Sequence, residues 1–305
     1  MSLSNDVAAP ASFSSVDFDH LRRLRATQPA AIGTALAKRR RRPLMQGDER
    51  LLIIAADHPA RGALGVHGHP MAMASRYELL QRLATALSRP GVDGVLGTAD
   101  ILEDLAVLGV LDDKIAVGSM NRGGLHGAAF EMDDRYTGYD VESIIRSNLD
   151  FAKVLIRINL GDAASARTLE ETARAVSQAA AAQLPIMIEA FMSTWVDGRI
   201  RNDLTTEAVI TAVAIASGLG SSSAYSWLKL PVVPQMERVM EASTLPTLLL
   251  GGDPEGGPDE TFASWEKALA LPGVRGLVVG RTLLFPANDD VAAVVDTAAA
   301  LVHSS

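Results

Sequence analysis

The feature that most constrains the fold of this chain is a rhythm of short apolar runs separated by stretches long enough for helices. Each run has the length of a strand rather than of a helix. The eight runs cover 51–56, 92–97, 114–119, 152–158, 185–190, 225–230, 246–251 and 274–280. Most are continuously apolar, as expected for parallel strands that are covered on both faces.

Helical patterns occupy stretches between and after these runs, at 71–88, 168–182, 205–217 and 289–303. Ser165 and Thr205 are expected helix caps, because a hydroxyl can accept a hydrogen bond from the first turn. Eight strand–helix alternations predict a closed (β/α)8 barrel. The competing fold, a doubly wound open sheet, lacks its glycine fingerprint after the first run.

The chain has 305 residues, which suits one barrel of ~250 residues with additions. We expect a single barrel domain over 46–305, preceded by a tail and one helix within 1–45. The helix is predicted over 16–42, and the basic run 38–42 would end it, because cations are favoured at a helix C-terminus. The alternative for this basic run is an arm that binds RNA or a membrane.

Composition narrows the function. The net charge is −8 with no basic patch to offset it, so nucleic-acid binding is not expected. The absence of cysteine excludes disulfides, thiolate zinc sites and a catalytic thiol. No apolar run approaches the ~20 residues that span a bilayer and no signal pattern is present, so we expect a cytoplasmic protein away from membranes. We expect no cofactor. The sequence does not decide between a monomer and a homo-oligomer.

Polar residues interrupt three of the predicted strands on one face only. In the fourth run Lys153, Arg157 and Asn159 share one parity, while the aliphatic residues between them share the other. Glu189 in the fifth run and Lys229 in the sixth alternate with aliphatic neighbours in the same way. Side chains of a barrel strand alternate between the lumen and the helix layer. We expect these five to face the lumen, because unpaired burial under helices is costly.

Charged groups in a dry lumen cost several kcal/mol even when paired, which indicates a function; the alternative is an ion pair that only plugs the barrel. Amine catalysis needs a lysine with a pKa well below ~10.4. Lys229 beside Lys153 meets this need, because burial and a second cation both lower the pKa. We expect Lys229 to form a Schiff base with a carbonyl, with Glu189, or second Asp57, moving protons.

The ends of the last two runs predict an anion site. Gly251 and Gly252 follow the seventh run, and Gly280 and Arg281 follow the eighth. Phosphate sites of (β/α)8 barrels lie at these two places, where glycine lets the backbone approach and arginine can grip phosphate with two hydrogen bonds. We therefore expect the substrate to be a phosphorylated small molecule.

The order of these residues resembles the class I aldolases, most closely the tagatose 1,6-bisphosphate aldolase branch, which is related to the fructose-bisphosphate and deoxyribose-phosphate aldolases. The resemblance covers roughly 50–300 and is carried by short segments at 137–140, 151–155, 185–189, 227–231 and 274–281, together with Asp57. It implies a metal-independent lyase that acts on a phosphorylated sugar or keto acid. In that branch the strand-six lysine, which falls on Lys229, forms the Schiff base.

Two segments depart from the family pattern. Residues 58–62 replace a shorter turn after Asp57, and residues 119–124 make a polar mouth after the third run. Ser119 and Arg122 in this mouth are candidate substrate contacts, together with Arg157 and Asn159. Arg61 is either a substrate contact or a surface charge, and His58 has no assigned role.

Two other functions remain open. One is a metal-dependent hydrolase on the same fold, because His67 and His69 form a His-x-His pair after the first run. Such a site needs further histidine or carboxylate ligands after later strands, and the ends of the fifth, sixth and eighth runs hold no histidine. The other is a sugar-phosphate-binding barrel without catalysis.

Overall fold

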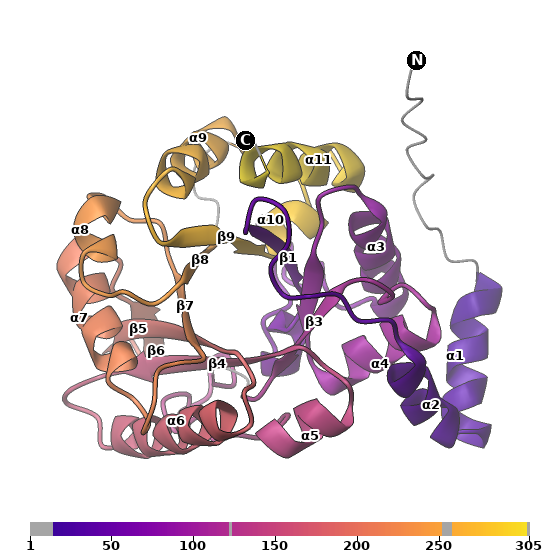
Figure 1. Ribbon diagram of the computed structural model, residues 1–305, viewed down its shortest axis with the longest axis horizontal. Helices are drawn as coiled ribbons and strands as arrows, with labels where there is room; N and C mark the ends of the chain where they lie inside the picture. Colours follow the sequence, from indigo (N-terminus) through magenta and orange to yellow (C-terminus); the bar gives the residue numbers. More distant parts are fainter. Residues whose placement is uncertain (1–14, 122–123, 252–257, 304–305) are drawn as a thin grey trace.

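The computed structural model describes residues 15–121, 124–251 and 258–303, and it confirms the predicted (β/α)8 barrel (Figure 1). The barrel strands are β1 Leu51–Ala55, β2 Gly94–Gly97, β3 Ile115–Ser119, β4 Phe151–Ile158, β5 Ile186–Val196, β7 Ser226–Leu230, β8 Thr247–Leu250 and β9 Val274–Val279. They are parallel and pair in the order β4-β3-β2-β1-β9-β8-β7-β5, and a further β4–β5 pairing closes the ring.

Helices surround this ring and connect its strands. They are η1 His58–Arg61, α3 Arg76–Ser88, α4 Ala99–Val107, α5 Val141–Arg146, α6 Ala164–Ala181, α7 Thr206–Ser217, α8 Met236–Met240, α9 Pro258–Leu269, α10 Arg281–Leu284 and α11 Val291–Val302. Thr205 caps α7 as predicted, because its side chain accepts a hydrogen bond from Ala208 N–H. The prediction that Ser165 caps a helix is wrong: α6 begins at Ala164, and Ser165 lies inside its first turn.

The core has the two shells that the alternating pattern predicts. Val154, Ile156 and Ile188 belong to the shell between strands and helices. Phe151 and Trp227 belong to the lumen shell, where their rings meet edge to face with centroids 5.5 Å apart. Trp227 thus packs in the lumen core. Among the helices that the structure describes, none has the length and apolar character needed to cross a bilayer.

The N-terminal segment forms two helices, α1 Ser15–Thr27 and α2 Ala30–Lys38, which lie outside the barrel next to α4 (Figure 1). The prediction of one helix over 16–42 is therefore wrong. Pro29 explains the break, because proline cannot donate the helical hydrogen bond and its ring collides with the preceding turn. Pro29 instead starts the second helix as its N-cap, where no such bond is needed.

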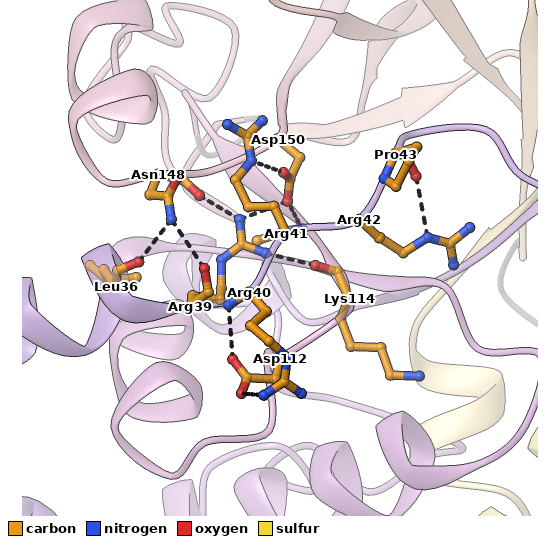
Figure 2. Close-up of polar contacts among 11 residues, drawn as sticks. Leu36, Arg39, Arg40, Arg41, Arg42, Pro43, Asp112, Lys114, Asn148 and Asp150 are labelled. Atoms are coloured by element: carbon orange, nitrogen blue, oxygen red, sulfur yellow. Dashed lines mark hydrogen bonds and ion pairs between the residues drawn. The ribbon is translucent and has the colours of Figure 1, made fainter.

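The basic run after α2 crosses the floor of the barrel, where the strands begin (Figure 2). Arg39 is buried and pairs with the buried Asp150 at 2.8 Å, and Arg41 contacts the other oxygen of this carboxylate at 2.6 Å. Arg42 pairs with Asp93, which precedes β2. The run therefore ends a helix as predicted, because α2 stops at Lys38 with Arg39 as its C-cap, but the arginines after it are bound by carboxylates at the strand starts. Leu44 and Met45 follow and pack against the lumen shell.

The end of α11 reaches the same floor. The imidazole of His303 lies 2.8 Å from Asp48 and 3.2 Å from Asp93. Hydrogen bonding to Asp93 raises the pKa of His303 to about 9; burial opposes this, while Asp48 adds to it. Both the segment before β1 and the segment after β9 are thus attached to the carboxylate of Asp93.

Candidate active site

The four residues predicted to carry the chemistry meet inside the barrel, between β1, β4, β5 and β7. Lys153 Nζ lies 2.8 Å from Asp57 Oδ2 and 2.8 Å from Glu189 Oε2. Lys229 Nζ lies 3.0 Å from the other oxygen of Glu189. Each of these side chains is largely buried. Glu189 therefore bridges the two amines, and Lys153 reaches upward from low in β4 to join the two carboxylates.

The two lysines have opposite tendencies to hold a proton. Burial lowers the pKa of Lys229, and the charge of Lys153 lowers it further, against the opposing effects of Glu189 and Asp57. Burial also acts against the charged form of Lys153, but Asp57 and Glu189 outweigh it and raise the pKa of Lys153 above its usual value. Lys229 is therefore the amine that loses its proton more readily, and Lys153 remains the cation.

The carboxylates are held in their charged forms. Burial would raise the pKa of Glu189, but Lys153 and Lys229 lower it to about 2. The pKa of Asp57 is also well below its usual range, because Lys153, His58 and Lys229 outweigh the effect of burial. Near neutral pH both groups are therefore carboxylates.

A cavity of about 530 Å³ opens above this cluster at the carboxyl ends of the strands. Glu189 and Lys229 reach it from below, and Phe191 from β5 lines its wall. His58 also lines it; burial lowers the pKa of this imidazole to about 3, Asp57 opposes the shift and Arg281 adds to it. The imidazole is therefore neutral at physiological pH and offers a hydrogen-bonding group without charge.

The predicted anion site lies on the same cavity. Gly251, Gly280 and Arg281 all line it. A side chain at Gly280 would place Cβ 2.5 Å from the carbonyl oxygen of Ala55 and 2.9 Å from the ring of His58, so this close approach requires glycine. Gly252, the fourth residue predicted for this site, is outside the described residues.

The other predicted substrate contacts are not all brought together. Arg157 and Arg61 line the cavity, whereas Ser119 is buried beside the cluster, with its Oγ 3.5 Å from Asp57 and 2.8 Å from the carbonyl of Asn121. Asn159 serves a local turn, where its Oδ1 accepts from Gly161 N–H at 2.8 Å. Its own N–H donates to Ser165, which explains why that hydroxyl does not cap α6.

Arg122 is outside the described residues. The histidine pair of the hydrolase alternative, His67 and His69, is exposed in the loop between η1 and α3 and does not line the cavity. Within the described ranges, no group of three histidine, cysteine or carboxylate side chains is arranged to hold a metal ion.

Two residues near the site were not predicted. Asn121 follows β3 and bonds to both backbone groups of Leu155 in β4, donating to its carbonyl at 2.7 Å and accepting from its N–H at 2.9 Å. Glu131, buried in the loop before α5, contacts Arg157 at 3.1 Å. The polar run 119–124 indicates a functional segment that contains Asn121. Glu131 is a single glutamate in a long loop, and no sequence pattern predicts its position.

The fold and this site can be set beside known proteins. A family model described as Cgl0159-like matches residues 49–299. The crystal structure of Cgl0159 from Corynebacterium glutamicum is 66% identical, covers 97% of this chain and 99% of its own, and has a TM-score of 0.94. No functionally curated protein matches the sequence.

Two aldolase structures are more distant. A Schiff-base-forming fructose-1,6-bisphosphate aldolase is 19% identical, with a TM-score of 0.61 and coverage of 89% of this chain and 100% of its own. The fructose-bisphosphate aldolase from Slackia heliotrinireducens is 14% identical, with a TM-score of 0.67 and coverage of 91% and 87%. At such identities the likeness shows a shared fold.

Proposed function

The chain belongs to the Cgl0159-like family, and we propose that it is a class I aldolase that makes or breaks a carbon–carbon bond through a lysine Schiff base. The observation that carries this proposal is the bridge of Glu189 between Lys153 and Lys229, which joins an amine of lowered pKa to an amine of raised pKa. The shared fold with Schiff-base-forming aldolases supports it.

In the proposed reaction Lys229 Nζ adds to a ketone carbon, and the carbinolamine loses water to give an iminium. A base removes the proton of the hydroxyl on the carbon two positions from the iminium carbon. The bond from this carbon to the carbon next to the iminium breaks, an aldehyde leaves, and the electron pair of the broken bond converts the iminium to an enamine. The enamine takes up a proton, and water then releases the product and the free amine. Glu189 is the proposed proton carrier and Asp57 the second candidate, because both are held as carboxylates.

The proposed substrate is a phosphorylated sugar or keto acid. Arg281 supplies a cation beside Gly251 and Gly280 at the rim of the cavity, and guanidinium and backbone N–H groups are the usual phosphate donors. The carbonyl carbon of such a substrate would then lie over Lys229. This reaction needs neither a metal nor a cofactor.

Reductive trapping tests the proposal. We expect borohydride, added with a panel of phosphorylated keto-sugars, to fix the mass of at least one of them on the peptide that contains Lys229. The variant Lys229→Met should lose this adduct, while Lys267→Met, which changes an exposed lysine of α9, should keep it. Folding of each variant is checked by circular dichroism.

Each other outcome has a definite meaning. An adduct on Lys153 would reverse the roles of the two lysines and keep the mechanism. No adduct with any keto-sugar would contradict the aldolase and support a binding barrel without catalysis. Turnover that is lost on adding a chelator would support the metal-dependent hydrolase.

A further inference from the structure

Two arginines that the proposed reaction does not use line the cavity in addition to Arg281. Arg157 stands at the end of β4, and Arg61 ends η1, the turn after β1. In the ring of strands, β4 lies half-way round the barrel from β9, the strand that precedes Arg281. A ligand that reaches from Arg281 past Lys229 therefore extends toward Arg157.

The loop between β3 and α5 holds both arginines in place. Glu131 accepts from Arg157 Nη1 at 3.1 Å, and its other oxygen accepts from Gly127 N–H at 2.9 Å. The carboxylate is only 5% exposed. In the same loop His126 N–H donates to the carbonyl of Arg61 at 2.8 Å. One segment thus fixes the guanidinium from β4 and the backbone from η1.

The backbone of this loop lies directly against the ion pair. Gly124 has φ +79, and a Cβ there would lie 2.3 Å from the carbonyl oxygen of Glu131 and 3.2 Å from Arg157 Nη1. Both the left-handed conformation and the close approach call for glycine. The conformation of the loop therefore depends on close contact with Arg157.

The positive charges of Arg61 and Arg157 lie close enough to disfavour one another. Burial and the nearby charge of Arg61 lower the pKa of Arg157 to about 10, although Glu131, Asp134 and Glu189 act in the opposite direction. Arg157 is still a cation at neutral pH, so two guanidinium groups face the same cavity. Like charges kept together in a partly buried wall are typical of a site that binds an anion.

We propose that Arg61 and Arg157 form an anion subsite for a second charged end of the substrate, and that Glu131 is its positioning residue. The inference deepens the proposed function and rests on it for the ligand, a phosphorylated open-chain sugar held at Arg281. The group bound at the subsite is a carboxylate or a second phosphate, both of which guanidinium binds through paired hydrogen bonds.

Binding of three linear probes tests the subsite without any turnover. Glucitol 6-phosphate has one charged end, 6-phosphogluconate adds a carboxylate at the other end, and glucitol 1,6-bisphosphate adds a phosphate there. None has a ketone or aldehyde group, so none can form a Schiff base. By calorimetry we expect one doubly charged probe to bind at least about 10-fold more tightly than glucitol 6-phosphate, which is about 1.4 kcal/mol; which of the two is preferred identifies the group.

Substitutions then locate this preference. Arg157→Gln and, independently, Arg61→Gln should remove most of it while leaving the affinity for glucitol 6-phosphate within about 2-fold, because only the second end is affected. Arg281→Gln should weaken all three probes. Glu131→Gln should reduce the preference, since the carboxylate that orients Arg157 is lost. Arg135→Gln, which changes an exposed arginine that follows the same loop, is the control and should keep it.

Two outcomes overturn the inference. One is equal affinity of the unchanged protein for all three probes. The other is a preference that survives Arg61→Gln and Arg157→Gln; the contact with Glu131 would then only fasten the loop. Because Arg61 is outside the contact with Glu131, its variant serves even where Arg157→Gln fails to fold. If borohydride trapping fails but the preference for a doubly charged probe is retained, the result contradicts the aldolase proposal and still supports the anion subsite.

Discussion

Lys153 and Lys229 share one carboxylate but differ in the charge around them. Lys153 contacts Asp57 and Glu189, whereas Lys229 contacts one carboxylate among the described residues, that of Glu189. The second carboxylate raises the pKa of Lys153, and the ammonium that results helps to lower the pKa of Lys229. The division of roles between two identical side chains thus follows from the position of Asp57.

The variant Lys153→Met should slow the proposed Schiff-base formation near neutral pH. Without this cation, Asp57 and Glu189 act on Lys229 uncompensated and raise its pKa, so less of the amine is neutral. We expect the rate of borohydride trapping at pH 7 to fall by at least about 10-fold, since one pKa unit changes the neutral fraction tenfold. The acid limb of the pH–rate profile should move to higher pH.

The variant Lys153→Arg keeps the positive charge and serves as the control, with a smaller displacement of the profile. A Lys153→Met protein that is folded and shows an unchanged profile would contradict the electrostatic role of Lys153.

At the residue scale the sequence predicts the inner cluster and misses part of its surroundings. Lys153, Glu189 and Lys229 could be predicted because strand alternation fixes which side chains enter a lumen. The same rule predicts that Asn159 faces the lumen, but β4 ends at Ile158, so its alternation no longer sets the direction of that side chain. Glu131 comes from a loop, where no periodicity predicts position.

At the element scale, Asn121 joins β3 to β4 through its side chain. Its amide bonds to the N–H and the carbonyl of Leu155 in the way that a neighbouring strand would. It also donates to Asp134 at 2.9 Å, which attaches the loop that carries Glu131. This asparagine therefore extends the pairing of the two strands to the rim.

The variant Asn121→Ala should destabilise the protein, because it leaves two buried backbone groups of Leu155 without partners. Each unmade buried hydrogen bond costs about 1–3 kcal/mol, so we expect the free energy of unfolding to fall by about 2–4 kcal/mol. Urea denaturation followed by circular dichroism measures it. Asn288→Ala, at an exposed turn before α11, should change it by less than about 0.5 kcal/mol; similar values for both variants would contradict the bridging role.

The strands could be predicted more fully than the segments between them. A buried parallel strand leaves a continuous apolar run, whereas α3 begins five residues later than its apolar pattern, at Arg76. The hairpin that extends β5 to β6 Arg199–Asn202 was not predicted. Its turn is Asp197-Gly198, with φ of 49 and 71, and this dipeptide is a strong hairpin signal that the barrel rhythm obscured.

At the scale of the whole molecule, the floor of the barrel depends on ion pairs that link distant parts of the chain. Arg39 and Arg41 meet at Asp150, and Arg42 and His303 meet at Asp93. The segment between α2 and β1 also covers the lumen from below, because Leu44 and Met45 pack there.

Stability should fall as the pH rises from about 6.5 to about 9. The pKa of His303 is raised to about 9 in the folded protein, so its stabilisation is complete below the unfolded value near 6.5 and is lost as the pH passes the folded value. Because the ring is partly exposed, solvent screening limits the loss to about 1–2 kcal/mol.

Urea unfolding at pH 6 and at pH 9.5 measures this change. His303→Gln should flatten the pH dependence over this range, whereas His20→Gln, at an exposed position of α1, should retain it. A His303→Gln protein with an undiminished loss at high pH would assign the effect to another group.

The arginines of the floor and the amines of the cavity lie at opposite ends of the barrel strands. Ion pairs that link distant segments lie where the strands start, and the amines of Lys153 and Lys229 lie toward the cavity, with the packed lumen of Phe151 and Trp227 between them. Loops at the cavity end can therefore be exchanged during evolution without weakening these ion pairs. Relatives that share the same barrel floor can consequently diverge in the compounds that they bind.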